Sequence, residues 1–407
     1  MTRKINLGFV PPETIETEDG IVLFNRFTSK KIYTDNKIMK EITPSELEKL
    51  TSGNVEITEP ELKKLRLELT LLCNADCDYC LVYKNEIPQI GNSMELTTTK
   101  KIVKKFNSEI QDGSIMAIGG EPFIKKESLV YILENANGRI GVYTNGTLIT
   151  PDIMPLLKKP NVATFFSFDG PEELNFHRKY KGGKPLFEDT LKGYLSLLEA
   201  GANTAVNCLV TNSNVNSMLD IVQNFHEKYG ENSFGLSMPH HTKINNFEVD
   251  IVKYTENMKK LFDYAKNEGI YVDQIAKRLS PLLDETFRYY ACKMVGEQET
   301  FYPNGSKTLC TKIDTIPELK DKDKSYFESL LPINNEGCYN CSSISVCGGG
   351  CFWDRTFSDD NMDARECHYN NGMLVKILQD IGGHINEKNK VVDMPPIKPI
   401  YKKMVSR

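Results

Sequence analysis

The sequence predicts an α/β protein with a partial (β/α)6 barrel of the TIM type, a small N-terminal α+β unit and a C-terminal cysteine-rich domain. Three observations lead to this prediction. Short apolar runs alternate six times with amphipathic helical patterns between residues 65 and 268. Polar or glycine-rich motifs follow the first four runs. Ten of the 11 cysteines fall into two groups, one near residue 77 and one between 292 and 367.

The N-terminal unit is expected to cover residues 1–62. A hairpin is predicted from GIVLFNRF and KKIYTD, and a short helix is predicted to begin at Thr43-Pro44-Ser45-Glu46, where a capping residue precedes a proline. No apolar run approaches ~18 residues, and the N-terminus lacks a signal-peptide pattern. With a formal net charge of -5, the composition favours a cytoplasmic protein that binds neither nucleic acid nor membrane.

The barrel is expected to span residues 63–285. Its predicted strands are LRLELTLL, SIMAI, IGVYT, VATFFSF, TAVNCLV and FGLSM, each followed by a helical pattern. Strands separated by such helices are typically parallel and joined by right-handed crossovers. The motifs CNADCDYC, GGEP, TNG and SFDG follow the first four strands in that order. We therefore expect them to meet at the C-terminal rim, where barrel enzymes carry their chemistry.

The motif CNADCDYC places Cys73, Cys77 and Cys80 at the spacing C-x3-C-x2-C. A chain without an export signal is not expected to hold structural disulfides, so metal binding is the better explanation. Three thiolates can hold three irons of a cubane and leave the fourth iron without a protein ligand. Zinc remains the alternative, although it would normally need a fourth cysteine or histidine nearby.

The second group of cysteines falls in an expected domain at 286–385, which ends with a helix predicted from NNGMLVKILQDIGGHI and precedes a tail at 386–407. Its spacing is C-x2-C-x5-C-x3-C between residues 338 and 351, with further cysteines before and after. The turn YPNGS at Gly305 predicts a hairpin between Cys292 and Cys310. Cys208 stands alone in a predicted strand, where a buried apolar role is the simplest explanation.

The three-cysteine spacing, the aromatic Tyr79 and the GGEP motif resemble the radical S-adenosylmethionine superfamily over about residues 65–250. The resemblance implies that S-adenosylmethionine chelates the open iron and is cleaved to a 5'-deoxyadenosyl radical that abstracts hydrogen. It also implies a set of cofactor contacts: Tyr79, Gly119, Gly120, Glu121, Pro122, Thr144, Asn145, Ser167 and Asp169. In this set Glu121 would accept from the methionyl ammonium.

The seven C-terminal cysteines resemble the SPASM domain of radical enzymes that modify peptides and proteins. By position, the resemblance assigns Cys338, Cys341, Cys347 and Cys367 to a second auxiliary cluster, and Cys292, Cys310 and Cys351 to a first one. Together with the catalytic cluster this gives three 4Fe-4S clusters. The first auxiliary cluster is one ligand short. A substrate thiolate could fill the open iron, or water, Met294, a carboxylate or a histidine could close it.

The resemblance implies a maturase that installs a crosslink, most directly a cysteine thioether, in a ribosomal precursor peptide. A formylglycine maturase of the anaerobic sulfatase type, a carbon-carbon crosslinking or epimerising enzyme, and an iron-sulfur electron carrier remain alternatives. A peptide or protein substrate and a reductant such as flavodoxin or ferredoxin are the expected partners. Residues 1–62 are either a reduced leader-recognition module or a barrel cap. His240, His241 and Asp354 are candidates for proton transfer.

Overall fold

The computed structural model describes residues 2–17, 20–35, 42–82, 88–242, 247–358, 360–386 and 398–405. The chain divides into two compact units. The barrel unit comprises Pro60–Val249 and Lys293–Phe327. The flanking unit comprises Met1–Glu59, Asp250–Cys292 and Glu328–Arg407. The domain boundaries expected from the sequence, at 62, 285 and 385, stay predictions.

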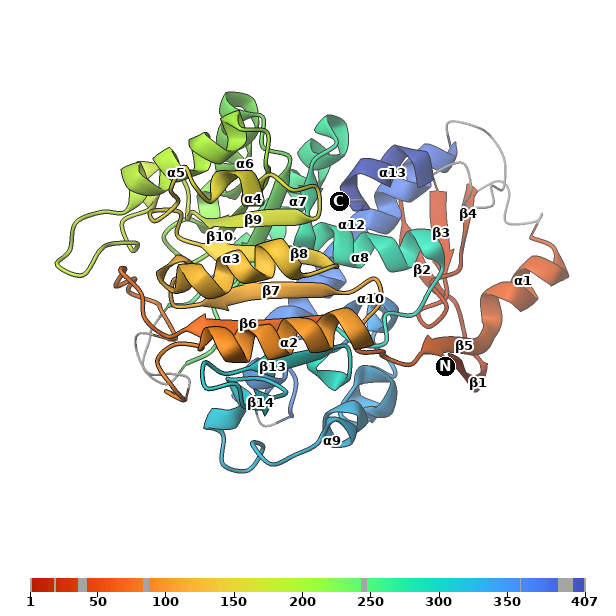
Figure 1. Ribbon diagram of the computed structural model, residues 1–407. Helices are drawn as coiled ribbons and strands as arrows, with labels where there is room; N and C mark the ends of the chain where they lie inside the picture. Colours follow the sequence, from red (N-terminus) through yellow and green to blue (C-terminus); the bar gives the residue numbers. More distant parts are fainter. Residues whose placement is uncertain are drawn as a thin grey trace. The chain divides into compact units, whose positions relative to one another are not determined.

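The barrel unit is built on one mostly parallel sheet (Figure 1). Its strands are β6 (Lys64–Thr70), β7 (Ser114–Gly119), β8 (Arg139–Thr144), β9 (Val162–Ser167), β10 (Asn203–Leu209), β11 (Ser233–Ser237), β13 (Gln298–Phe301) and β14 (Lys307–Thr308). They lie in the order β11-β10-β9-β8-β7-β6-β13-β14, and all neighbours are parallel except the β13 and β14 pair. The predicted α/β fold with six successive parallel strands is therefore confirmed.

Helices connect these strands as the alternating pattern predicts. They are α2 (Leu96–Glu109), α3 (Lys126–Asn135), α4 (Met154–Leu157), α5 (Phe187–Glu199) and α6 (Met218–Tyr229). In Figure 1, α2 and α3 cover the face of the sheet turned toward the viewer, and they pack on each other. Three leucines on alternate positions of β6 are fully buried. Apolar residues on one face of each helix and strand thus form the core of the barrel unit.

The predicted YPNGS hairpin forms between β13 and β14, with Gly305 at φ 87°. The sequence did not predict that β13 also pairs in parallel with β6, with Glu299 opposite Leu65. A strand more than two hundred residues away in the chain thus joins the barrel sheet beside its first strand. The hairpin belongs to the barrel unit.

The flanking unit combines two small sheets with a group of helices. Its strands are β1 (Thr2–Phe9), β2 (Glu13–Glu16), β3 (Gly20–Phe24), β4 (Lys31–Asp35), β5 (Ser52–Thr58) and β12 (Tyr271–Val272). Its helices are α1 (Pro44–Thr51), α7 (Ile251–Glu268), α8 (Asp273–Asp284), α10 (Ile344–Cys347), α11 (Phe352–Arg355), α12 (Ala364–Asn386) and α13 (Lys398–Val405), while α9 (Lys324–Ser329) crosses the division between the units. The long α12 packs on α7, α8 and the β2-β3-β4 sheet.

Two N-terminal predictions are confirmed. The antiparallel β3 and β4 form the expected hairpin, and Thr43 caps α1 in a capping box in which Glu46 returns the bond. The sequence did not predict β1 and β5, which pair with each other, or β2, which extends the hairpin to three strands. In the described part of the chain, every helix is too short or too polar to cross a membrane.

Candidate active site

Three cysteines lie on the loop that follows β6. Cys73, Cys77 and Cys80 are half-buried cysteines. The backbone N–H of Cys80 donates to the carbonyl of Cys77 (3.1 Å), and the N–H of Ala75 donates to Cys73 Sγ (3.4 Å). This local folding collects three soft sulfur donors on one short loop, the donor set of a cluster with one open iron.

A second segment braces this cysteine loop. The N–H of Asp76 donates to the carbonyl of Lys179 (2.8 Å), and the N–H of Asp78 donates to the carbonyl of His177 (3.1 Å). The Asp78 carboxylate also pairs with the Lys179 ammonium (2.6 Å). Because the bracing bonds are mostly between backbones, the cysteine loop keeps its shape independently of its side chains.

The two glycines of GGEP lie against the same loop. A Cβ on Gly119 would stand 2.1 Å from the carbonyl oxygen of Thr70, and a Cβ on Gly120 would stand 2.2 Å from that of Leu72. The N–H of Gly120 donates to the Thr70 carbonyl (2.7 Å). The sequence indicated glycines that admit a ligand, and the structure shows that the close neighbour is the chain's own backbone. Their cofactor contact stays a prediction.

Glu121 ties the GGEP turn to the TNG turn. Its fully buried carboxylate accepts from the Thr144 hydroxyl (2.8 Å), the Asn145 N–H (2.8 Å) and the Phe123 N–H (3.2 Å). Burial raises the pKa of Glu121 to about 7, although these hydrogen bonds act in the opposite direction. In the structure Glu121 links the GGEP and TNG turns through these hydrogen bonds. Its contact with a methionyl ammonium stays a prediction.

Asn145 in turn reaches the cysteine loop. Its side-chain amide donates to Asn74 Oδ1 (2.9 Å) and lies 3.9 Å from Cys73 Sγ. Asn74 donates to the hydroxyl of Thr147 (2.8 Å). The motifs after β6, β7 and β8 therefore meet at one rim, as the sequence predicted from their positions after successive strands.

Tyr79 joins the SFDG motif to the same rim. Its hydroxyl donates to Asp169 Oδ2, and Asp169 Oδ1 accepts from Arg178 (3.0 Å) and from the N–H of Leu209 (3.2 Å). The Arg178 guanidinium is buried and lies 5.4 Å from the Tyr79 ring centre. Burial alone would lower the pKa of Arg178, but Asp169 raises it well above its usual range.

Sequence reasoning missed Arg178. Its Nε–H is buried and has no hydrogen-bond partner among the described residues. A buried guanidinium with an unpaired donor, next to the cysteine loop, fits an anionic group such as a cofactor carboxylate. The only signal in the sequence is the cationic run HRKYKGGK after SFDG, in which the buried Arg178 stands beside the half-buried Lys179 and the exposed Lys181 and Lys184.

The other predicted site residues lie on several elements. Pro122 begins a single 3-10 turn after Glu121, and Ser167 ends β9 half-buried. His240 and His241 follow β11 in the barrel unit, where the Lys312 ammonium lies 2.8 Å from His240 Nε2. Asp354 belongs to the flanking unit and pairs with Arg365 (3.5 Å). Proton transfer by these three residues stays a prediction.

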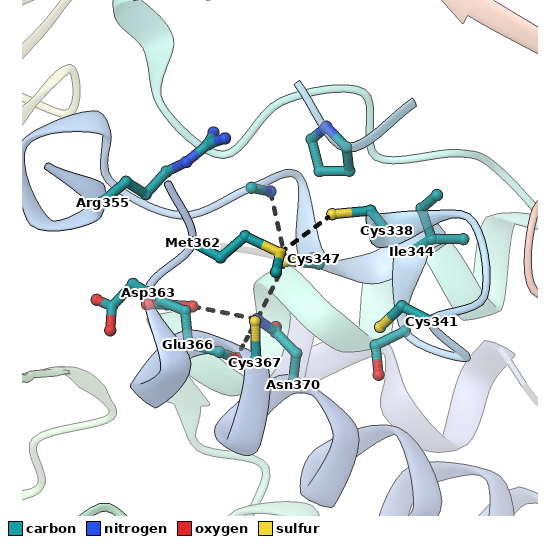
Figure 2. Close-up of a pocket in the computed structure, with 13 residues that line it drawn as sticks. Cys338, Cys341, Ile344, Cys347, Arg355, Met362, Asp363, Glu366, Cys367 and Asn370 are labelled. Atoms are coloured by element: carbon teal, nitrogen blue, oxygen red, sulfur yellow. Dashed lines mark hydrogen bonds between the residues drawn. The ribbon is translucent and has the colours of Figure 1, made fainter. Parts of the chain in front are cut away.

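Four cysteines of the flanking unit line one cavity (Figure 2). These are Cys338, Cys341, Cys347 and Cys367, the set assigned by position to the second auxiliary cluster. The N–H of Cys341 donates to the carbonyl of Cys338 (3.0 Å), and Cys347 Sγ accepts from the Gly349 N–H (3.4 Å) and the Asn370 amide (3.4 Å). Four thiols around one cavity are the full donor set of a 4Fe-4S cluster.

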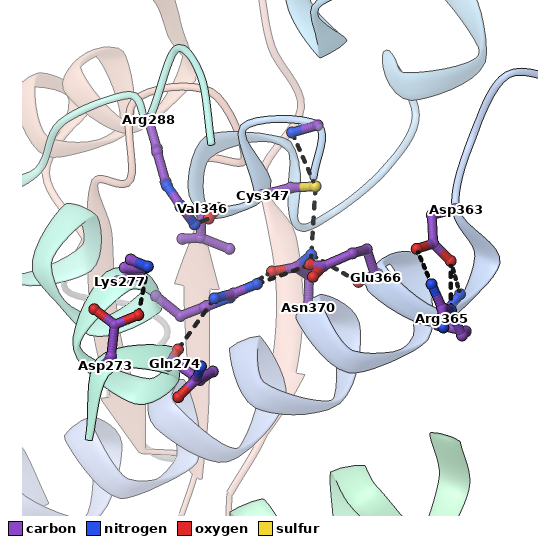
Figure 3. A network of polar contacts seen from close by, with 12 residues as sticks. Asp273, Gln274, Lys277, Arg288, Val346, Cys347, Asp363, Arg365, Glu366 and Asn370 are labelled. Atoms are coloured by element: carbon purple, nitrogen blue, oxygen red, sulfur yellow. Dashed lines mark hydrogen bonds and ion pairs between the residues drawn. The ribbon is translucent and has the colours of Figure 1, made fainter. Parts of the chain in front are cut away.

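A network of polar contacts lies next to Cys347, one of the cysteines that line this cavity (Figure 3). Arg278 donates to Asn370 Oδ1 (2.8 Å) and to Glu366 (2.8 Å). Burial raises the pKa of Cys347 to about 11, while Arg278 and Arg288 oppose that shift. Positive groups and N–H donors near sulfur favour thiolates, and metal binding would release the thiol protons.

The other cysteines are distributed between the units. Cys292 and Cys351 belong to the flanking unit and Cys310 to the barrel unit. Their assignment to a three-ligand first auxiliary cluster therefore stays a prediction. Cys208 is fully buried in β10, which agrees with the apolar role expected for it.

Comparisons with known proteins agree with this site. Residues 67–225 match the family model described as the Radical SAM superfamily. The chain is 24% identical to the radical SAM cyclopropyl synthase TigE of Paramaledivibacter caminithermalis over 372 residues, which is 82% of this chain and 74% of the relative.

Two solved structures share the fold. Polyhistidine-tagged anSMEcpe with bound AdoMet matches with a TM-score of 0.63 at 19% identity and covers 84% of this chain and 99% of its own. Streptococcus suis SuiB bound to S-adenosylmethionine matches with a TM-score of 0.58 at 16% identity and covers 86% and 98%. The family match implies S-adenosylmethionine and one 4Fe-4S cluster as cofactors.

Proposed function

We propose that this chain, which is a radical S-adenosylmethionine enzyme, abstracts hydrogen from a residue of a ribosomal precursor peptide and installs a cysteine thioether crosslink there. The observation that carries the proposal is the convergence of four motifs on the cysteine loop. Glu121 of GGEP contacts the TNG turn, Asn145 of that turn contacts Asn74 of the cysteine loop, and Asp169 of SFDG contacts Tyr79 of the same loop. Such mutual bracing fixes thiol positions before any cofactor binds.

The residues of the rim suit the cofactors. Cys73, Cys77 and Cys80 would hold the cluster, and the unpaired Arg178 Nε–H suits the carboxylate of S-adenosylmethionine. Ser167 and Asn145 would supply polar contacts at the same rim. When bound, the cluster and S-adenosylmethionine supply a hydrogen-abstracting radical. The role of the chain is to hold both and to keep the substrate carbon within reach.

The peptide substrate is inferred from the flanking unit and from the relatives. Its cavity of four cysteines suits an auxiliary cluster, and the neighbouring anSMEcpe structure includes forms with bound peptides, while a SuiB structure holds its precursor peptide SuiA. We propose that Cys292, Cys310 and Cys351 hold a further cluster whose open iron receives the substrate cysteine as a thiolate. A flavodoxin or ferredoxin in the cytoplasm would supply the electron.

The first test is release of 5'-deoxyadenosine by the anaerobically reconstituted enzyme with S-adenosylmethionine and dithionite. Replacing Cys73, Cys77 and Cys80 with alanine should abolish release, whereas Cys208→Ala serves as the matched control and should retain it. Release that survives the triple replacement, or its absence from the wild-type enzyme, would contradict the proposal and favour an electron carrier.

The second test identifies the product. A cysteine-containing peptide encoded beside the gene would be treated with the enzyme and then with iodoacetamide. A thioether predicts loss of two hydrogens with sulfur retained and no alkylation at that cysteine. An alkylatable cysteine with two hydrogens lost indicates a carbon-carbon crosslink, and loss of sulfur indicates formylglycine. Either result would replace the thioether assignment.

A further inference from the structure

The inner face of β6 carries charged side chains at alternate positions. Lys64, Arg66 and Glu68 line a cavity of about 340 Å³ in the barrel unit. The leucines that alternate with them, Leu65, Leu67 and Leu69, are fully buried on the other face. A strand directs alternate side chains to opposite faces, so the pattern K-x-R-x-E places its charges together in this cavity. The volume is sufficient for an amino-acid side chain.

The formal charge of the cavity lining is positive. Lys64, Arg66 and Lys312 carry three positive charges against the one negative charge of Glu68, which is the only carboxylate among the described residues that line it. Arg66 donates to Glu68 (3.1 Å), and Glu68 is almost fully buried. The Lys312 ammonium lies 2.8 Å from His240 Nε2. The described lining therefore has a positive formal charge that an anionic ligand would offset.

Arg66 also has an unsatisfied donor. Its Nε–H is buried and lacks a hydrogen-bond partner in the described part of the chain. An unpaired buried donor is costly, and a guanidinium offers Nε and a terminal nitrogen as a fork that matches a carboxylate. The cavity lining thus combines excess positive charge with a buried donor that lacks a partner among the described residues.

The cavity reaches the radical site. Gly119, which begins the GGEP turn, and Leu81, which follows the last cysteine of the loop, both line it. Met116 and Tyr143 provide an apolar wall, so a group bound here would pack its carbon atoms against this wall. A substrate residue bound at its charged end would stand next to the cysteine loop.

We propose that this cavity binds a carboxylate of the peptide substrate, with Arg66 as the specificity-determining residue and Lys64 and Lys312 as supporting cations. The inference rests on the proposed peptide-modifying function and names the chemistry of the residue that enters the barrel. The carboxylate belongs either to an acidic side chain or to the C-terminus of the peptide.

The experiment uses the reconstituted full chain with S-adenosylmethionine and ligand-observed NMR. The probes are N-acetyl-glutamate α-amide, which has a side-chain carboxylate, N-acetyl-leucine, which has a C-terminal carboxylate, and the neutral N-acetyl-glutamine α-amide. At least one acidic probe should bind about tenfold or more tightly than the neutral probe, and the tighter of the two identifies the source of the carboxylate.

Two variants assign the effect to Arg66. The double replacement R66Q/E68Q removes the pair together, so that no buried charge is left alone, and should weaken the acidic probe about tenfold or more. Arg66→Lys should retain part of the affinity. The matched control is Arg139→Gln, an exposed arginine at the start of β8, which should bind the probes as the wild type does.

Release of 5'-deoxyadenosine without peptide separates this inference from the proposed function. If wild-type enzyme releases 5'-deoxyadenosine but does not distinguish acidic from neutral probes, the carboxylate site is refuted and the radical function stands. If the double variant keeps full affinity for the acidic probe, Arg66 is not the specificity residue and the inference is likewise overturned.

Discussion

Replacing Arg278 with methionine would remove a buried cation from the network behind the second group of cysteines. Arg278 is 5% exposed and makes charge-assisted hydrogen bonds of 2.8 Å to both Asn370 and Glu366. Breaking a buried pair by removing one partner typically costs about 3–5 kcal/mol. The Glu366 side chain is 22% exposed, and water would partly solvate the abandoned carboxylate, so we expect the lower end, about 3 kcal/mol.

The assay is urea unfolding of the apo chain followed by circular dichroism. The matched control is Lys277→Met, one residue earlier in α8, whose side chain is 47% exposed and pairs with Asp273. That replacement should change the free energy of unfolding by about 0.5 kcal/mol or less. Equal unfolding midpoints for the two variants would refute the stabilising role of the Arg278 network.

A second measurement addresses the cluster itself. Asn370, which Arg278 holds, places its amide 3.4 Å from Cys347 Sγ. Hydrogen bonds to sulfur and nearby positive charge favour the reduced, more negative state of an iron-sulfur cluster. An EPR-monitored redox titration of the reconstituted chain should therefore give a lower potential for Arg278→Met than for Lys277→Met, and Arg278→Lys should restore part of the difference. An unchanged potential would show that the network serves stability alone.

Three further predictions concern the rim of the barrel. Gly120→Ala should lower the iron bound per chain after reconstitution, because the added Cβ would stand 2.2 Å from the carbonyl of Leu72; unchanged iron content would contradict this packing. Tyr79→Phe loses the bond to Asp169 and should cost about 1 kcal/mol of unfolding free energy, measured in urea. Because burial raises the pKa of Glu121 from 4.5 to about 7, the folded chain binds that proton more tightly than the unfolded chain. The free energy of unfolding should then fall by about 3 kcal/mol as pH rises from about 4.5 to 7, and Glu121→Gln should flatten that part of the profile. Parallel profiles would refute the assignment.

Local patterns predicted most of the fold. Alternation of apolar runs and helices located β6 to β11, and Thr43 with Glu46 marked the start of α1, because these signals depend on neighbours in the chain. The pairing of β13 with β6 was not predictable in this way. A four-residue strand has little periodicity of its own, and its partner lies far away in sequence.

The candidate site was likewise predictable only where local sequence signals were sufficient. The motifs after β6, β7 and β8 were expected to meet because parallel strands bring their C-terminal ends to one edge, and Asn145 and Cys73 do meet there. Arg178 was missed because its burial depends on contacts with Tyr79 and Asp169, which join the cysteine loop to the connection between β9 and α5. Spacing reveals which loops converge, but it does not reveal which of several cations in a loop turns inward.

The sequence also leaves open whether Arg66 faces solvent or the interior of the barrel, for a different reason. In an open sheet that has one wet face, alternate charged residues on a strand usually face solvent. In a barrel, the second face of the strand borders the interior instead, so the same alternation places Lys64, Arg66 and Glu68 along one cavity. The leucines of β6 would be buried in an open sheet as in a barrel, so hydropathy does not distinguish the two kinds of sheet. Once the strand is known to begin a barrel, its charged alternate positions become candidates for substrate contact, and an exposed helix charge such as Lys277 does not.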